Sequence, residues 1–209
     1  ALIPSTNPTS TAFFKILVAV KARNAIVLAP HPSAARCTYE AAYVMAQAAE
    51  KAGAPRGLIS CIQQISLEGT NELMSHKRTA LILATGGSPM VRAAHSTGKP
   101  AYGVGPGNVP VYVDRSADIH KAARYIVASK SFDCSTICAT EQAVIADRPI
   151  AKQLAELMYA EGAYFCNEWE TDQLRKTVFN PNGSMNVAVV GKPATYVAAY
   201  AGLSVPDTT

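Results

Sequence analysis

The 209-residue sequence lacks the features of a membrane protein, a secreted protein or a nucleic-acid-binding protein. It has no run of about 18 uncharged apolar residues that could span a bilayer. Its opening stretch, ALIPSTNPTST, lacks the basic and apolar regions of a signal peptide. Lysine and arginine nowhere gather densely enough to follow a nucleic-acid backbone, and the net charge is only +4. We therefore expect a cytoplasmic protein with neither a membrane nor a nucleic acid as its partner.

Metal-binding and disulfide patterns are also missing from the sequence. Neither CxxC nor HExxH occurs and the four histidines are scattered, so we expect no metal site. An odd number of cysteines without a targeting signal favours reduced thiols over a disulfide framework. The five cysteines are Cys37, Cys61, Cys134, Cys138 and Cys166.

The composition that is present favours a folded core. Hydrophobic residues make up 49% of the chain and charged residues only 16%, which argues against disorder. Both ends of the sequence look cut. The chain opens with a Pro-rich turn that leads directly into a helix, and it closes just after a helix-like segment. We therefore expect a fragment of a larger protein.

Up to Phe132, short apolar segments alternate with helical ones, and the first helix carries an apolar stripe of Phe13, Phe14, Leu17 and Val18. Uninterrupted apolar strands joined by helices favour right-handed crossovers and an open parallel sheet with helices on both faces. The expected strands are residues 25–30, 57–63, 80–87, a strand beginning at 100, and 109–114. The expected helices are residues 8–21, 31–53, 66–76, 88–98 and 118–132.

The character of the sequence changes after Phe132. A strand over 141–146 and a helix over 150–161 are followed by a loop, a further short helix and the turn NPNG. We therefore place a domain boundary near Phe132. The sequence predicts an α/β, Rossmann-like domain over 1–132 and the start of a second α/β domain over 133–209.

Three of the expected strands end in unusual loops, and open parallel sheets bind ligands at the carboxyl ends of their strands. Glycines before a helix start expose backbone N–H groups, which suits a phosphate or pyrophosphate. A tight turn that needs positive φ explains such glycines equally well. A local turn likewise explains His31, which stands between two prolines in the first loop. Three such loops on one sheet edge nevertheless favour a bound nucleotide. The loops contain Pro30 and His31, then Gly86, Gly87 and Ser88, and then Gly105, Pro106 and Gly107.

Cys134 and Cys138 lie between the two expected domains, where a substrate cleft would lie. A reducing cytosol disfavours a disulfide across four residues. Two packed thiols or one nucleophile remain as alternatives, and the residues alone do not decide between them. Cys37, Cys61 and Cys166 are expected to be packed thiols.

Five motifs occur in a specific order: PSTNPTSTA, APHP, LATGG, GVGPGN and FDCSTICATEQAV. Together they resemble the CoA-acylating aldehyde dehydrogenases of the acetaldehyde and propionaldehyde type, within the aldehyde dehydrogenase superfamily. The resemblance covers essentially the whole chain. It implies that residues 1–132 bind NAD and that residues 133–209 are a truncated part of the catalytic domain.

The resemblance also implies roles for single residues. The family's nucleophile opens a run like C-A-S-E-Q, which here is Cys-Ala-Thr-Glu-Gln, so Cys138 is the implied nucleophile and Cys134 a bystander. Relatives usually have Asn or a similar polar residue where Cys134 stands. Asn7 matches the family's asparagine whose amide helps to form the oxyanion hole, although from the residues alone it could be a turn or cap residue. The role of Glu141 stays open.

By the same resemblance, the three loops surround NAD, and coenzyme A is the acyl acceptor. The sequence offers no clear acidic residue that would read the ribose, so NAD rather than NADP is inherited from the family. Hydrolytic relatives carry E-L-G-G where this chain has Val-Gly-Pro-Gly, residues 104–107. Their glutamate activates water, so its loss favours a thiol as the acceptor.

The implied substrate is a short aldehyde such as acetaldehyde or propionaldehyde, and the implied partner is a second copy of the chain in a dimer or tetramer. Some relatives lie inside a bacterial microcompartment, so a shell is a possible partner. Three alternatives stay open: a non-acylating aldehyde dehydrogenase, an enzyme like glutamyl-phosphate reductase that uses NADPH, and a nucleotide-binding fragment whose thiols only pack.

Overall fold

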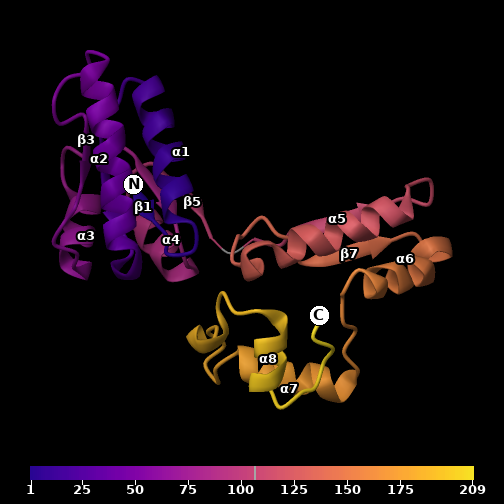
Figure 1. Ribbon diagram of the computed structural model, residues 1–209. Coiled ribbons are helices and arrows are strands. Elements are labelled where there is room, and N and C mark those ends of the chain that lie inside the picture. Colours follow the sequence, from indigo (N-terminus) through magenta and orange to yellow (C-terminus); the bar gives the residue numbers. More distant parts are fainter. Residues whose placement is uncertain (106) are drawn as a thin grey trace. The chain divides into compact units, whose positions relative to one another are not determined.

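The computed structural model describes residues 1–105 and 107–209. Pro106, which is expected at the cofactor, lies outside the described residues. The chain forms two compact units, Ala1–Gly107 and Asn108–Thr209 (Figure 1). Each unit is described by itself.

The units divide 25 residues earlier than the boundary that the sequence predicts near Phe132. The reason is strand pairing: β6 (Pro110–Val113) pairs in parallel with β7 (Ala143–Ala146) in a sheet of its own. Helix α5 (Ile119–Ser131) packs in the same unit, against the helix that follows β7. The roles of the two parts, as NAD-binding and catalytic domains, stay predictions.

The first unit is built on a five-stranded parallel sheet of order β3-β2-β1-β4-β5. This is the doubly wound order in which the winding reverses between β1 and β4. The predicted Rossmann-like α/β fold is therefore confirmed. The strands are β1 (Leu2–Ile3), β2 (Ile26–Pro30), β3 (Ile59–Cys61), β4 (Ile82–Thr85) and β5 (Ala101–Val104).

The central strand, β1, is not predicted by the sequence, which reads there as a Pro-rich turn. The strand has only two residues, Leu2 and Ile3, and both are buried. Leu2 pairs with Ala29 on one side and with Ala84 on the other. Two residues are too few to show a periodic pattern, so only their neighbours in space identify them as a strand.

Helices cover both faces of this sheet, as the alternating pattern predicts. On one face α1 (Pro8–Lys21) and α2 (Ala35–Lys51) lie side by side (Figure 1) and enclose Ile16, Leu28 and other apolar residues. The opposite face packs against α3 and α4. These helices span Leu67–Ser75 and Ser88–His95, and a 3-10 turn, η1 (Pro32–Ala34), precedes α2.

Helix α4 lies unusually close to strand β5 because of a glycine. A Cβ on Gly103 would meet Val91 at 2.5 Å and the His95 ring at 2.8 Å, both on α4. Any side chain at this position would therefore push the helix away from the strand. The close packing keeps the start of α4 near the end of the sheet.

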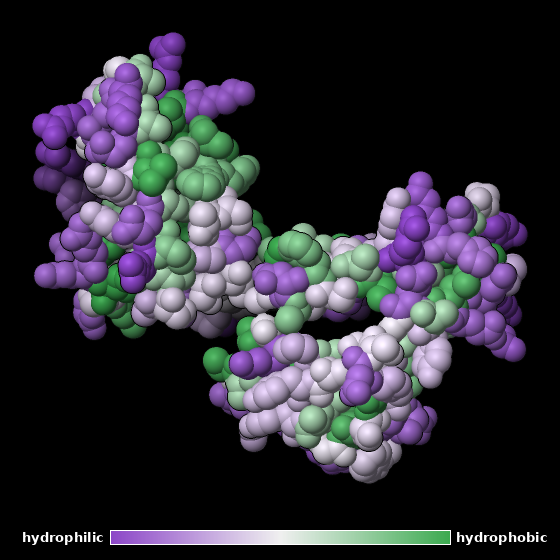
Figure 2. All heavy atoms as spheres, viewed as in Figure 1, coloured by the Kyte–Doolittle hydropathy of each residue, from purple (hydrophilic) through white to green (hydrophobic). Residues whose placement is uncertain are grey.

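The apolar stripe expected on the first helix is not the face that packs on the sheet. Phe14 and Leu17 are 64% and 60% exposed, and Phe13 and Val18 are also exposed. Figure 2 shows hydrophobic residues on the outer surface of the first unit. The buried face of α1 consists of small or short side chains together with Ile16 and a lysine: Thr11, Ala12, Lys15, Ile16 and Ala19. The helix itself spans Pro8–Lys21, as predicted.

The second unit has a smaller parallel sheet, β6-β7, covered on one face by α5 and α6 (Arg148–Ala160). Val113, Ile126 and Leu154 form its buried core together with Ala123. The Asp118 carboxylate caps α5 by accepting from the Lys121 N–H at 3.1 Å. The strand and helix predicted after residue 140 are therefore present.

The rest of the second unit, after α6, contains two helices and a 3-10 turn joined by irregular segments. Asn167 and Glu170 form a reciprocal capping box at the start of α7 (Glu168–Val178), which satisfies the first free N–H groups of that helix. The 3-10 turn η3 (Val187–Val189) and helix α8 (Ala194–Tyr200) follow.

Candidate active site

The predicted cofactor residues of the first unit gather at the carboxyl edge of its sheet. Backbone bonds hold these loops together: the His31 N–H donates to the Ile3 carbonyl at 3.0 Å, and the Gly86 N–H donates to the Val104 carbonyl at 3.1 Å. A Cβ on Gly105 would lie 3.9 Å from the Gly86 carbonyl oxygen, so these two loops are neighbours. The residues are Pro30 and His31 after β2, Gly86, Gly87 and Ser88 after β4, and Gly105 after β5.

Positive φ does not explain the two glycines after β4. Neither Gly86 nor Gly87 is among the residues with positive φ, and Gly87 has φ −64°. Space within the chain does not explain them either, because an added Cβ would meet only ordinary contacts at 3.7 Å or more. The chain's own fold therefore tolerates alanine at both positions. Gly86 and Gly87 leave the backbone at the edge of the sheet unobstructed by side chains.

This open backbone leads into the N-terminus of α4. Among the described residues, the N–H groups of Gly87 and Ser88 have no acceptor, and Pro89 has no N–H. The first turn carries no acidic residue. Free N–H groups and the positive end of the helix dipole suit the phosphates of a dinucleotide.

His31 makes local hydrogen bonds, as expected for a residue of a local turn. It is exposed and stands before η1, where its Nδ1 lies 2.7 Å from the Ser33 hydroxyl and accepts from the Ser33 N–H at 3.2 Å. This turn closes the loop after β2. A contact between His31 and a nucleotide stays a proposal.

Asn7 stands at the N-cap position of α1, but its side chain does not cap the helix. Its amide oxygen accepts from the Thr6 hydroxyl at 3.2 Å, and among the described residues the amide N–H₂ has no acceptor. The residue is partly exposed. Its amide is therefore able to donate to a ligand, whereas a role as a capping side chain is ruled out.

Lys15 is a buried charged residue of the first unit that the sequence analysis did not single out. It is 4% exposed, and its ammonium donates to the carbonyls of Leu2 on β1 and Leu83 on β4, at 2.8 and 2.9 Å. Burial lowers its pKa from 10.5 to about 8. A lysine within an otherwise apolar helix face was the only sequence signal that pointed to it.

In the second unit, Cys138 lies in a turn directly before β7 and its side chain is exposed. The buried Thr140 stabilises this turn, because its hydroxyl and N–H both donate to the Ile137 carbonyl, at 3.0 and 3.1 Å. The Gln142 N–H then donates to Val109, at the start of β6, at 2.9 Å. The turn thus presents an accessible thiol five residues before the start of β7.

The residues before this turn have a strained backbone. Asp133, Cys134 and Ser135 have φ between 50° and 60°, a region that side chains other than glycine rarely occupy. The Cys134 thiol is also exposed. Glu141 contributes a second irregularity, because its Oε2 atom is buried without a partner among the described residues.

The other cysteines differ in burial. Cys37 was expected to pack, but it is exposed and lines a shallow hollow of about 590 Å³ between α1 and α2. The helix places it on the solvent side, which a helical location alone does not reveal. Cys61 and Cys166 are half-buried, and burial raises the pKa of both thiols.

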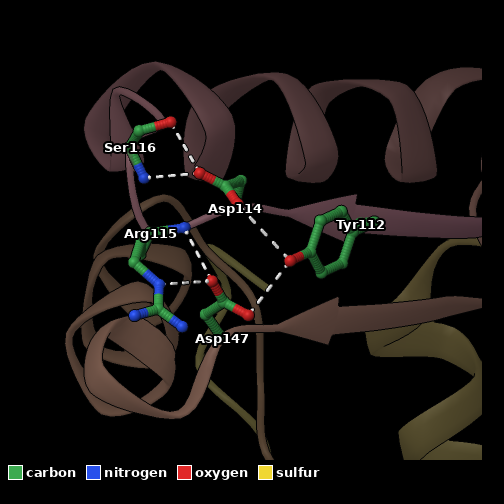
Figure 3. Close-up of polar contacts among 5 residues, drawn as sticks. All are labelled: Tyr112, Asp114, Arg115, Ser116 and Asp147. Atoms are coloured by element: carbon green, nitrogen blue, oxygen red, sulfur yellow. Dashed lines mark hydrogen bonds and ion pairs between the residues drawn. The ribbon is translucent and has the colours of Figure 1, made fainter.

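A polar cluster joins the carboxyl ends of β6 and β7, at the opposite end of β7 from Cys138 (Figure 3). The Arg115 side chain donates to Asp147 at 3.0 Å, and so does the Tyr112 hydroxyl. Asp114 accepts from the Ser116 hydroxyl at 2.6 Å. These bonds lower the pKa of both carboxyl groups. The cluster links the two strands.

Among the described residues, no histidine, cysteine and acidic side chains form a group of three or more that could hold a metal ion. Within the part of the chain that the structure describes, no helix is long and apolar enough to cross a membrane.

A model of the aldehyde dehydrogenase family matches residues 1–164. The chain belongs to the aldehyde dehydrogenase family. The resemblance inferred from the motifs is thereby confirmed. Among curated relatives, the bifunctional aldehyde-alcohol dehydrogenase AdhE of Escherichia coli (strain K12) is 47% identical over 208 residues, which covers 100% of this chain and 23% of the relative.

Solved structures of aldehyde dehydrogenases share the fold. An acetylating aldehyde dehydrogenase from Geobacillus thermoglucosidasius matches with a TM-score of 0.91 and 56% identity, over 99% of this chain and 46% of that one. A propionaldehyde dehydrogenase from Rhodopseudomonas palustris with bound propionyl-CoA matches with a TM-score of 0.87 and 36% identity, also over 99% and 46%. The chain thus spans less than half the length of these family members.

Proposed function

We propose that the protein containing this chain catalyses the NAD-dependent, CoA-acylating oxidation of a short-chain aldehyde, acetaldehyde or propionaldehyde, to its acyl-CoA. One observation carries the proposal: the thiol of Cys138, first residue of the Cys-Ala-Thr-Glu-Gln run, is exposed in a turn that Thr140 stabilises. The similar solved structures, one acetylating by name and one with bound propionyl-CoA, support the acyl acceptor.

Cys138 provides the chemistry by forming and breaking a thioester. Its thiolate attacks the aldehyde carbon, and the carbonyl electron pair moves to oxygen to give a tetrahedral thiohemiacetal. Loss of hydride from this carbon leaves an acyl thioester on Cys138. The thiolate of coenzyme A then attacks the thioester carbon, acyl-CoA leaves, and the Cys138 thiolate is restored. One thioester replaces another, so the sequence is reversible.

Asn7 contributes the oxyanion donor of this scheme, together with the backbone N–H of Cys138. The support is that the Asn7 amide N–H₂ has no acceptor among the described residues, although the residue stands at a helix start. A single donor of this kind typically contributes about 10²–10³ to the rate.

NAD, when bound, accepts the hydride. The residues that would hold it are those of the carboxyl edge: Pro30 and His31, the Gly86–Ser88 loop, and Gly105, with Pro106 and Gly107 following. The open glycine backbone and the free N–H groups at the start of α4 fit its pyrophosphate. Val104 occupies the place of the hydrolytic relatives' glutamate, so no carboxylate is there to activate water.

The test is product analysis with the full-length protein. NAD and acetaldehyde or propionaldehyde are supplied with and without coenzyme A, and the products are identified by mass spectrometry. We expect acyl-CoA only when coenzyme A is present, and none from Cys138→Ser. Cys134→Ser is the matched control, because it removes an exposed thiol four residues away.

Other products would indicate the alternatives. Free acid formed at the same rate without coenzyme A would indicate a non-acylating enzyme, and NADPH-dependent reduction of an acyl phosphate would indicate the reductase. Full acyl-CoA formation by Cys138→Ser would overturn the role of the nucleophile. We also propose that the full-length protein forms a homodimer or homotetramer. Its proposed location is the cytoplasm or the inside of a microcompartment shell.

A further inference from the structure

Lys15 is the one ionisable side chain that is buried among the described residues. It lies on the α1 face that packs on the sheet, between Ile16 and small residues. Burying an ammonium is costly unless its hydrogen bonds are replaced, and here two carbonyls replace them. The lowered pKa, about 8, reflects this cost and still leaves the side chain mostly charged at neutral pH.

The two carbonyls belong to different strands on either side of the point where the sheet's winding reverses. Leu2 is in β1 and Leu83 is in β4, and the Lys15 ammonium lies 2.8 and 2.9 Å from their oxygens. The strands themselves share a single residue pair, Leu2 with Ala84. The ammonium therefore supplies two of the few bonds that hold β1, β4 and α1 together.

Each of these three elements begins or ends close to a residue of the proposed active site. β1 ends four residues before Asn7, and β4 ends directly before Gly86. Helix α1 begins at Pro8, directly after Asn7, and carries Lys15 two turns later. A shift between β1 and β4 would move the oxyanion donor relative to the loop proposed for the pyrophosphate.

We propose that Lys15 is a positioning residue, which ties α1, β1 and β4 together and so holds Asn7 and the Gly86–Ser88 loop in their working arrangement. This inference rests on the proposed function. Lys15 touches neither substrate nor cofactor in this scheme; it acts through the backbone of the strands that it joins.

The experiment compares Lys15→Met with three variants of the same helix in the full-length protein. Ile16→Ala empties part of the same core without touching either carbonyl, so it controls for lost stability. Lys21→Met removes an exposed lysine and controls for charge. Lys15→Arg keeps a cationic donor at the site. The thermal midpoint, kcat with coenzyme A, and the NADH dissociation constant are measured, at a temperature where every variant is folded.

We expect Lys15→Met to lower kcat and to weaken NADH binding, each by about tenfold, the effect of losing a hydrogen bond to a charged group. Ile16→Ala should lower the midpoint yet keep both values within about twofold, and Lys21→Met should match the native protein. Lys15→Arg should recover part of each loss. Equal kcat and NADH affinity in Lys15→Met and Ile16→Ala would overturn the inference.

Two further arms separate the possible failures. If Lys15→Met does not fold, Lys15→Arg is compared with Ile16→Ala instead, and a loss no greater than that of Ile16→Ala refutes the inference. NADH binding is also measured in a Cys138→Ser background, where the thiol plays no part. Absence of NADH binding by the native protein would overturn the proposed function, whereas unchanged binding by Lys15→Met would overturn only the role of Lys15.

Discussion

The N–H of Gln142 donates to the carbonyl of Val109 at 2.9 Å, and this bond fixes the start of β7 beside the start of β6. Cys138 lies four residues before Gln142, in the turn that Thr140 stabilises. The exposed thiol is therefore attached to a sheet rather than to a free loop. A nucleophile gains from such an attachment, because its direction of attack is set in advance.

Alkylation should show which thiol matters. Treatment with iodoacetamide should abolish acyl-CoA formation in proportion to the modification of Cys138, measured by peptide mass mapping. The Cys134→Ser variant should be inactivated at the native rate, since the exposed Cys134 is a bystander. Inactivation that follows modification of Cys37 or Cys134 while Cys138 stays free would contradict the assignment.

Replacing Asn7 should affect activity and not stability. Asn7→Ala is expected to lower kcat by about 10²–10³ because an oxyanion donor is lost. Its thermal midpoint should stay near the native value, because the side chain does not cap α1. Ser66→Ala is the matched control: the Ser66 hydroxyl caps α3 at 2.9 Å, so its loss should cost about 1 kcal/mol of stability at unchanged kcat. A large stability loss in Asn7→Ala would show that the residue is structural.

Two substitutions of glycine by alanine should have opposite effects: one should weaken NAD binding and the other should lower stability. In Gly87→Ala the new Cβ would meet Pro89 at 3.7 Å, so the fold should tolerate it, while NAD binding should weaken because the backbone is no longer open. In Gly103→Ala the Cβ would meet Val91 at 2.5 Å, which should cost about 1–3 kcal/mol by overpacking. Chemical denaturation and NADH titration check both. Unchanged NADH affinity in Gly87→Ala would count against a pyrophosphate at this loop.

The Arg115–Asp147 pair should make the second unit sensitive to acid. The bonds to Arg115 hold the pKa of Asp147 below its usual range, so the folded state releases the proton more readily than the unfolded chain. The resulting stability is present above the unfolded pKa of about 4 and is lost as pH falls through the folded pKa. Asp147→Asn should therefore lower the thermal midpoint at pH 7 and narrow its difference from the native protein near pH 3. A difference that is constant with pH would contradict this role.

Local patterns predicted most of the elements of this chain and missed specific contacts. Helix α1 spans the predicted residues, and the strands after residues 25 and 80 occur where apolar runs end in proline or glycine. The pattern failed at β1, which is too short to be periodic, and on α1, where the largest apolar side chains are exposed. Lys15 was missed because the acceptors of its hydrogen bonds lie 13 and 68 residues away in the sequence.

The order of most strands and helices, the glycine loops at their ends, and the motif that singles out Cys138 can all be read from the amino-acid sequence. These features depend on neighbouring residues, which a linear pattern contains. Three features become visible only in the folded chain: β1 is the central strand, β6 pairs with β7 instead of extending the first sheet, and the Asn7 side chain does not cap its helix. Strand pairing and burial depend on groups far apart in the chain, because hydrogen bonds and apolar contacts form between whatever surfaces folding brings together.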